Sequence, residues 1–270
     1  MKVRVQMSEK QDFEGRLALV TGGASGIGLA CCELLVARGA TLVLADIDEA
    51  RTHEAARRLG AQALVLDVSD HAAVQAAQAR LQAQGLQVEL LVNCAGIVQS
   101  PHTPADLPHE EFQRVLAIDF EGTYSCCAVF GSAMARAGRG AIVNIASVAG
   151  MRSMPLHAYS PAKAAVISLG ECLAAEWGRS GVRVNTVSPG YTVTAALQSQ
   201  IDLGLRDPEK LKAHSALGRL IAPQDIARVV VFLLSEEAGV LTGINVPADA
   251  GWLVAGSWGT FGGVRAAQAR

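Results

Sequence analysis

The sequence predicts one α/β domain, built as a doubly wound parallel sheet of about seven strands with helices on both faces. Short apolar runs alternate with helix-length stretches along most of the 270 residues, and this alternation indicates parallel strands joined by right-handed crossovers. Half of the residues are hydrophobic, only 18% are charged and only 4% are aromatic. Such a composition suits a large core of aliphatic side chains between sheet and helices.

The expected strands are runs rich in Val, Leu and Ile without an alternating polar face, so both faces of each should be buried. In chain order they cover residues 17–20, 41–45, 63–66, 90–93, 141–145, 182–185 and 244–246. Helical stretches lie between them, the first three at 27–38, 50–59 and 72–83. Because no linker or repeat divides the chain, we expect a flexible lead over 1–14 and a single domain over 15–270.

Two parts of this domain differ in character from the rest. Residues 190–218 are the least regular stretch, and since they follow the sixth strand we expect a loop at the carboxyl ends of the strands, serving as a substrate lid. Residues 253–270 form a tail in which Trp258 and Phe261 would be poorly placed in water. The tail is therefore a candidate contact with a neighbouring subunit, and Arg265 a candidate contact with that subunit's active site.

Composition and charge exclude several classes of protein. The net charge is −2 with no basic stripe, so no nucleic-acid partner is expected. Residues 1–14 lack the apolar stretch of a signal peptide, and no later apolar run reaches the roughly 18 residues of a membrane span. We therefore expect a cytoplasmic protein without a membrane partner. The six cysteines include two adjacent pairs and fit neither a zinc site nor a disulfide framework, which predicts buried free thiols and no metal.

A glycine-rich turn directly follows the first expected strand. Residues 21–28 read Thr-Gly-Gly-Ala-Ser-Gly-Ile-Gly, and glycines there let the backbone approach a pyrophosphate at a helix amino end. The spacing differs from G-x-G-x-x-G, and no Lys-Ser/Thr follows as in a P-loop. Tight packing alone is the alternative explanation. The position between strand and helix favours a Rossmann-type nucleotide site with contacts from Gly22, Ser25, Gly26, Ile27 and Gly28.

Asp46 ends the second strand and bears on the choice of cofactor. Its carboxylate can accept hydrogen bonds from the adenosine ribose hydroxyls and would repel a 2′-phosphate. No Arg or Lys lies at 22–28 or directly after Asp46, so the sequence predicts NAD rather than NADP, a solvated acid at a strand end being the alternative. Further cofactor contacts are expected at the ends of the third and fourth strands, from Asp67, Val68, Asn93, Ala95 and Gly96.

A second constellation follows the fifth strand, which ends at Ser147. Tyr159 and Lys163 stand at i and i+4 of an expected helix, so both side chains leave the same face. Pro161 is tolerated only in a first helical turn, which places Tyr159 near the helix start. A tyrosine with an ordinary pKa of about 10 is a poor base, but a Lys ammonium and a positive nicotinamide ring would lower that pKa. Ser147 would donate a hydrogen bond to the substrate oxygen.

With these motifs the chain resembles the short-chain dehydrogenase/reductase family, in its compact type, from about residue 15 to 252. The motifs are T-G-x3-G-x-G at 21–28, N-x-A-G at 93–96, Ser147 and Y-x3-K at 159–163. The resemblance implies that Tyr159 is the acid/base, that Lys163 holds the nicotinamide ribose and that Ser147 orients the substrate. It also implies cofactor contacts from Pro189, Gly190, Thr192 and Thr194.

The resemblance further implies a homotetramer with an interface built from the helices over 109–135 and 158–179, and the apolar stretch 124–137 agrees with this. Two positions depart from the family. Asp119 begins an Asp-Phe-Glu-Gly segment where the family usually has an Asn that positions a relay water. We expect Asp119 to keep Lys163 charged, with an altered pH profile. Ala250 stands where glycine is commoner.

The expected reaction interconverts a secondary alcohol and a ketone on a small molecule. Residues between Ser147 and Tyr159 should line the substrate site, from which we name Met151, Arg152 and His157, with core packing or solvent exposure as alternatives. A polyol, sugar-derived compound or hydroxy acid is the first choice of substrate, and a cyclic or hydrophobic secondary alcohol the second. Asp46 argues against a 3-oxoacyl carrier-protein reductase. From another class, an NAD-binding regulator without turnover remains an alternative.

Overall fold

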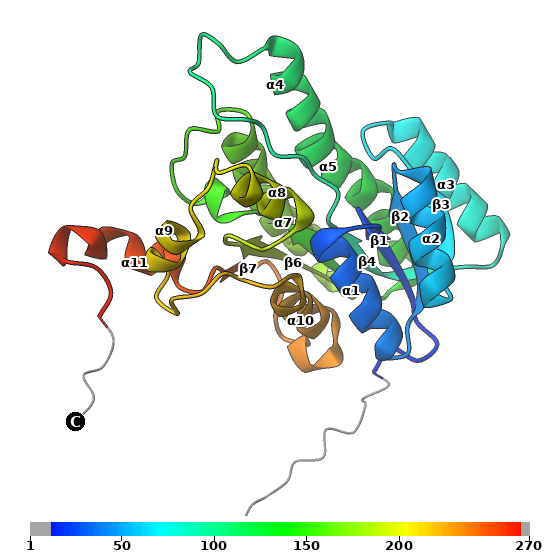
Figure 1. The fold of residues 1–270 in the computed structure, drawn as a ribbon. Coiled ribbons are helices and arrows are strands. Elements are labelled where there is room, and N and C mark those ends of the chain that lie inside the picture. The colour runs from blue at the N-terminus through cyan, green and yellow to red at the C-terminus, as the bar shows by residue number, and fades with distance from the viewer. Residues whose placement is uncertain (1–11, 266–270) are drawn as a thin grey trace, which may run out of the picture.

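The computed structural model describes residues 12–265, and a seven-stranded, all-parallel sheet runs through its centre (Figure 1). The strand order is β3-β2-β1-β4-β5-β6-β7. The order reverses between β1 and β4, which is where open parallel sheets bind ligands beyond their carboxyl ends. The strands are β1 Leu17–Thr21, β2 Thr41–Asp46, β3 Gln62–Val65, β4 Val88–Asn93, β5 Gly140–Ile145, β6 Val182–Pro189 and β7 Asn245–Ala248.

Two helical layers cover the sheet and divide its core in two. One core cluster joins the sheet to α1 (Gly26–Ala37), α2 (Glu49–Leu59) and α10 (Pro223–Leu234). The other joins it to α3 (His71–Ala83), the long helical segment after β4 and α7 (Tyr159–Trp177). The predicted fold class and all seven predicted strands are confirmed; β6, predicted to end at residue 185, continues to 189.

Several shorter elements complete the chain. The segment after β4 is one continuous helical run whose turns alternate between α and π geometry: α4 His109–Leu116, η1 Ala117–Glu121, α5 Gly122–Cys126, η2 Cys127–Gly131 and α6 Ser132–Ala137. Single 3-10 turns are η3 Val148–Gly150, η4 Gly178–Ser180 and η5 Glu236–Ala238, and the described chain closes with α11 Trp252–Ala255 and η6 Gly256–Phe261.

Residues 12–14 do not belong to a flexible lead, which corrects the expectation for that part of 1–14. The Phe13 side chain is fully buried and packs within the first core cluster. The guanidinium of Arg38 lies 5.2 Å from the Phe13 ring centroid, and Asp12 forms an ion pair with Arg38. A single aromatic side chain thus anchors the chain just before β1, whereas residues 1–11 lie outside the described part.

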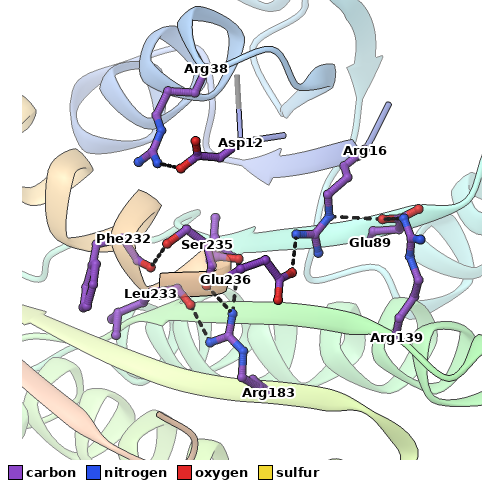
Figure 2. Close-up of polar contacts among 11 residues, drawn as sticks. Asp12, Arg16, Arg38, Glu89, Arg139, Arg183, Phe232, Leu233, Ser235 and Glu236 are labelled. Carbon is purple, nitrogen blue, oxygen red and sulfur yellow. Dashed lines mark hydrogen bonds and ion pairs between the residues drawn. The ribbon is translucent and has the colours of Figure 1, made fainter. Parts of the chain in front are cut away.

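Charged side chains at the amino ends of the strands serve the architecture (Figure 2). Arg16, before β1, pairs with Glu89 of β4 at 3.2 Å and with Glu236 at 3.1 Å. Arg183 of β6 donates to the carbonyl oxygens of Leu233, Leu234, Ser235 and Leu241, so its positive charge faces the negative end of the α10 dipole. The charged side chains at the amino ends of the strands are therefore paired and stabilise the fold. The groups that follow the carboxyl ends of the strands lie at the opposite edge of the sheet.

The predicted lid, residues 190–218, contains two helices rather than a plain loop: α8 Ala195–Asp202 and α9 Pro208–Ala213. Both ends of this segment are hydrogen-bonded to the end of β7 and the residues just after it. The Gly190 amide donates to the Ala248 carbonyl at 3.1 Å, and the Leu217 amide donates to the Ala250 carbonyl at 3.0 Å. Ala250 itself has φ +54°, the one positive φ of a residue other than glycine in the part that the structure describes.

The apolar stretch 124–137 belongs only partly to the subunit's own core, and its other face, including Val129, stays partly exposed. Cys126, Phe130 and Met134 are all buried within the second cluster, and Tyr124 is half exposed. The tail leaves two aromatic side chains exposed in the isolated chain. Trp258 is 51% exposed and Phe261 is 76% exposed in the isolated chain.

Three further properties follow from the described residues. None of their helices combines the length and apolarity needed to cross a bilayer. No group of three His, Cys, Asp or Glu side chains within 12–265 could hold a metal ion. The six cysteines, all within the described residues, are free thiols; four are buried, whereas Cys94 is partly exposed and Cys172 is exposed, so the expectation of burial is wrong for these two.

Candidate active site

The glycine turn and the loop after β4 meet at the carboxyl end of the central strands. The Thr21 hydroxyl, at the end of β1, accepts hydrogen bonds from the Cys94 amide at 3.1 Å and the Ala95 amide at 3.2 Å. Thr21, Asn93 and Asn144 are register partners on three adjacent strands. The side chain of the last residue of β1 therefore holds the loop after β4 beside the start of the glycine turn, at the point where the strand order reverses.

The turn before α1 is shaped for close backbone approach. A Cβ added to Gly28 would lie 2.1 Å from the Gly22 carbonyl oxygen, so no side chain fits there. Gly26 has φ +53°, a conformation that strongly favours glycine. Ser25, at the amino end of α1, makes no side-chain capping hydrogen bond. The turn thus presents a helix amino end that no side chain of its own covers, which suits an anionic group.

Asp46 lies beside this turn, at the end of β2. Its Oδ2 accepts a hydrogen bond from the Ala24 amide at 3.1 Å, and its Oδ1 accepts one from the Asp48 amide at 3.2 Å. The side chain is partly exposed. These bonds hold the carboxylate at the rim of the glycine turn, where the predicted ribose contact requires it.

The other predicted cofactor residues fall into two groups. Asp67 accepts hydrogen bonds from Ser69, and Val68 packs against Gly122, so both lie at the end of β3 as expected. The Asn93 side chain, however, is buried and donates to Asn144 at 2.8 Å and to the Cys127 sulfur at 3.1 Å. Its side chain therefore joins β4 to β5 and is turned away from the turn, which leaves Ala95 and Gly96 as the surface of that loop.

The start of the lid comes close to the glycine turn, although about 170 residues separate them. A Cβ on Gly26 would lie 3.2 Å from the Thr194 side chain. Thr194 caps α8 by accepting from the Leu197 amide, and the Thr192 hydroxyl donates to the Gly190 carbonyl. Pro189 ends β6. The predicted residues 189–194 therefore border the same edge as the turn.

Ser147, Tyr159 and Lys163 are brought together, as their spacing predicted. Ser147 follows β5, its hydroxyl accepts a hydrogen bond from the Ala149 amide at 3.1 Å, and it lies close enough to Tyr159 to oppose the rise in the pKa of the phenol. Tyr159 is the first residue of α7, and Lys163 follows one turn later with its Nζ 5.5 Å from the Tyr159 ring centroid. Lys163 is only 4% exposed and its Nζ donates to the Ile145 carbonyl at 3.1 Å. The arrangement gives a phenol flanked by an ammonium and a hydroxyl.

Asp119 lies under this group, in the π turn η1, and such turns are frequent at functional sites. Its side chain is fully buried, its Oδ1 accepts from the Ile97 amide at 2.8 Å, and Oδ1 lies 3.9 Å from Lys163 Nζ. Its Oδ2 has no hydrogen-bond partner among the described residues. A Cβ on Gly96 would lie 2.6 Å from this carboxylate, so the glycine of the N-x-A-G motif makes room for it.

Burial and charge act in opposite directions on these groups. Burial raises the pKa of Asp119, and Lys163 together with the Ile97 amide partly offsets this. Burial lowers the pKa of Lys163, but Asp119 and Tyr159 outweigh it, so the net pKa is raised and the ammonium persists. The expected effect of Asp119 on Lys163 is therefore present.

The sequence predicted a lowered pKa for Tyr159. Without a bound cofactor, the residues of the chain raise this pKa instead. Burial raises this pKa above its ordinary value, Asp119 adds to the rise, and Lys163 and Ser147 oppose it without overcoming it. The reason is that the desolvation of a phenolate exceeds the attraction of one nearby ammonium.

Three of the predicted substrate residues lie in the segment of chain between η3 and α7. Met151 is half-buried, and its sulfur accepts a hydrogen bond from Asn245 of β7. Arg152 and His157 are exposed. Sequence reasoning missed the roles of Thr21 and Asn144; a polar residue at the same end position of adjacent apolar strands was the available signal.

Comparisons with known proteins agree with this geometry. A family model described as Enoyl-(Acyl carrier protein) reductase matches residues 22–253. The chain is 36% identical to D-threitol dehydrogenase of Mycolicibacterium smegmatis, over 92% of its length and 98% of the relative's. It is 37% identical to galactitol 2-dehydrogenase of Rhizobium johnstonii (91% and 99%) and 36% identical to 2,5-dichloro-2,5-cyclohexadiene-1,4-diol dehydrogenase of Sphingobium indicum (89% and 98%). A 37% identical match, the uncharacterized short-chain type dehydrogenase/reductase y4vI of Sinorhizobium fredii, is longer: the chain spans 48% of it.

Solved structures extend the comparison. A protein described as ribose-5-phosphate isomerase from Brucella melitensis 16M superposes with a TM-score of 0.92 at 51% identity, over 94% of this chain and 99% of that one. A 3-oxoacyl-[acyl-carrier protein] reductase from Brucella melitensis with bound NAD has a TM-score of 0.80 at 30% identity (93% and 97%). ElxO with NADP bound has a TM-score of 0.83 at 27% identity (88% and 99%).

Proposed function

This chain belongs to the short-chain dehydrogenase/reductase family, and we propose that it is an NAD-dependent oxidoreductase that converts the secondary alcohol of a polyol, sugar-derived compound or hydroxy acid to a ketone. The observation that carries the proposal is the cluster of Ser147, Tyr159 and Lys163 at the same sheet edge as the glycine turn, in which Lys163 is buried and the other two side chains are partly exposed. A catalytic cluster and a nucleotide cradle at one edge are what hydride transfer requires.

NAD is proposed as the cofactor on the fit of the residues. The closely packed turn at Gly28 and the uncapped amino end of α1 suit a pyrophosphate. Asp46, held at the rim by the Ala24 amide, suits two ribose hydroxyls and opposes a 2′-phosphate. Gly22, Ala95, Gly96, Thr192 and Thr194 would complete the cradle. Relatives carry either nicotinamide cofactor, so the choice depends on Asp46.

The chain's own residues would manage the proton. When bound, NAD accepts a hydride from the substrate carbon and places a positive ring near the site. Tyr159, as the phenolate, takes the proton from the alcohol oxygen, and Lys163 stabilises that phenolate by its charge. Ser147 donates to the same oxygen as its carbon–oxygen bond becomes double. Asp119 keeps Lys163 protonated throughout.

The substrate class is proposed from the relatives and from the exposed groups near the site. Two of the relatives act on polyols, and the exposed Arg152 and His157 can hydrogen-bond to a hydroxyl-rich compound. The dichlorocyclohexadiene-diol dehydrogenase supports the second choice, a cyclic secondary alcohol. In both cases the oxidised carbon carries one hydroxyl and one hydrogen.

The test is NADH formation by the purified protein with a panel of polyols, sugar derivatives, hydroxy acids and cyclic alcohols, NAD and NADP in parallel. We expect turnover with NAD on one class. Ribose 5-phosphate belongs in the panel, because the 51% identical structure is described as its isomerase; conversion of it without net NADH would replace the proposal. Binding of NAD without turnover of any compound would favour the regulator.

A homotetramer is proposed as the assembled form, with the tail as one of its contacts. Val254, Trp258 and Phe261 are exposed in the single chain, and an apolar strip of this kind is covered in most stable proteins. Truncation after Trp252 should lower the oligomer mass measured by light scattering and weaken substrate affinity. Unchanged mass and affinity would remove the tail from the interface.

A further inference from the structure

The amino end of α7, which carries Tyr159, lacks a cap within its own sequence. The residue before the helix is Ala158, whose side chain has no acceptor. In the first turn the Ser160 amide donates to the Leu156 carbonyl at 2.9 Å, and Pro161 has no amide hydrogen. The amides of Ala158 and Tyr159 are therefore the two donors that need a partner from another part of the chain.

Gln99 supplies that partner from the loop after β4. Its Oε1 accepts a hydrogen bond from the Ala158 amide at 2.5 Å and from the Tyr159 amide at 3.0 Å. Because both partners are backbone donors, the side-chain atom facing them must be the oxygen. Gln99 is only 3% exposed, so water does not compete for these positions, and one buried carbonyl replaces the missing cap across nearly 60 residues.

The loop that carries Gln99 is itself held on both sides. The Ile97 amide donates to Asp119 Oδ1 at 2.8 Å, and the Ser100 amide donates to Glu111 Oε1 at 3.2 Å. Asp119 in turn lies 3.9 Å from Lys163 Nζ. One short loop is therefore connected to two residues of α7. It reaches Tyr159 directly through the Gln99 side chain, and it reaches Lys163 indirectly, through the Ile97 amide and Asp119.

We propose that Gln99 is a positioning residue for the acid/base: its side-chain carbonyl fixes the backbone of Tyr159 and so sets where the phenol lies against the substrate. The inference rests on the proposed function of Tyr159. A tyrosine on the first residue of a helix sits where helices fray most easily, and a displacement of about 1 Å at a reacting group costs roughly a hundredfold in rate. A cap delivered from the neighbouring loop suppresses that fraying.

Two other roles for Gln99 make different predictions. A role in general packing would lower stability and all kinetic constants together. A role in binding substrate is conceivable because the backbone around Gln99 borders a hollow of about 420 Å³ with Glu110 and Arg114; it would change KM while α7 stayed ordered. Only positioning predicts a fall in kcat that comes with faster amide exchange at the start of α7 while NAD affinity is kept.

The experiment compares Gln99→Met, which keeps length but loses the acceptor, with Gln99→Glu, which keeps an acceptor oxygen at the same place and loses the amide donor. Gln84→Met is the matched control, since Gln84 is exposed and bonds only to Gln62 among the described side chains. For each variant we would measure the melting temperature, NAD affinity, kcat and KM on the best alcohol of the panel, and hydrogen–deuterium exchange of peptides covering 156–163.

We expect Gln99→Met to lower kcat about 10- to 100-fold, with NAD affinity within twofold of wild type and with faster exchange at 158–159. Gln99→Glu should recover much of the lost kcat and of the protection, and Gln84→Met should match wild type. Wild-type kcat in Gln99→Met, or unchanged exchange at 158–159, would overturn the proposal. So would Met and Glu variants that are equally impaired, because then the acceptor is not what matters.

Failure of the proposed function would look different. If the wild-type protein oxidises no alcohol, the exchange measurement still decides whether Gln99 holds the first residue of α7. If the wild type is active and Gln99→Met is equally active, the proposed enzyme function is retained and the positioning role of Gln99 is rejected.

Discussion

The two sides of the proposed site are built in opposite ways. On the α7 side, Lys163 is 4% exposed, Asp119 is fully buried, and the polar side chains bond to one another or to backbone. On the lid side, Leu203 is 70% exposed and Leu205 is 69% exposed, and the segment is fastened mainly at its two ends.

This difference separates chemistry from recognition. Groups that move a proton must be held in place before substrate arrives, so they stand on strands and on the start of a long helix. The proposed lid is a segment with few buried contacts, and such a segment opens at a low free-energy cost. Substitutions on the α7 side should therefore change rate, and substitutions on the lid side should change affinity or stability.

The largest effect is expected from Tyr159→Phe. Loss of the phenol removes the acid/base, and we expect kcat to fall by about 10²–10⁴-fold, with NAD affinity unchanged because the cradle is intact. Initial rates and a fluorescence titration with NAD would check this. Retained turnover would show that the α7 side is not where the proton is handled.

Asp46→Ala should have the next largest effect, and it acts on the cofactor. Loss of charge-assisted bonds to a ribose removes roughly 1.5–3 kcal/mol, so kcat/KM with NAD should fall about 10- to 100-fold while NADP becomes usable. Rates with both cofactors give the ratio. An unchanged ratio would mean that Asp46 serves only to brace the turn through the Ala24 amide.

Asp119→Asn should shift the pH profile rather than abolish activity. The Asp119 carboxylate raises the pKa of both Tyr159 and Lys163, so its neutralisation lowers both. Oxidation requires deprotonated Tyr159, and therefore its rise with pH should move to lower pH in the variant. The profile of kcat against pH tests this, with the exposed Glu121→Gln as control. A profile that does not move would take Asp119 out of the electrostatics of the site.

The smallest effect is expected at the anchor of the lid. Ala250 has φ +54°, which costs an L-residue roughly 1–2 kcal/mol, while glycine adds an entropic cost of about 0.5–1 kcal/mol. Ala250→Gly should therefore raise the free energy of unfolding by at most about 1.5 kcal/mol. Chemical denaturation measures it, and the exposed mid-helix Ala76→Gly should do the reverse. Destabilisation by Ala250→Gly would mean that the alanine methyl group packs usefully.

The fold was predictable because its signals are local. Seven apolar runs and the helix-length gaps between them suffice for a parallel sheet, and Pro161 places the start of α7 at Tyr159. The Phe13 anchor was not predictable, since one aromatic residue in a polar lead has no periodicity. The apolar stretch 124–137 suggested a subunit contact, but hydrophobicity alone does not say which surface covers it.

The residues of the candidate site that belong to sequence motifs could be predicted. The contacts between residues far apart in the sequence could not. The positions of Asp46, Ser147, Tyr159 and Lys163 at one edge follow from strand ends and helical spacing. The bond from Gln99 to Tyr159 joins two segments whose approach depends on the whole sheet. Likewise, spacing shows that Lys163 is near Tyr159, but only burial shows that the pKa of Tyr159 is raised.

The attachment of the lid also sets an order of events in the making of the protein. Both ends of the proposed lid bind residues 248–250, which come about 30 residues after its last residue in the sequence. During translation the lid therefore emerges before its anchor. A chain that stops short of residue 248 carries the glycine turn, Gln99, Tyr159 and Lys163 but leaves both ends of the lid unattached, so the lid is fixed only after the proposed acid/base cluster has been made.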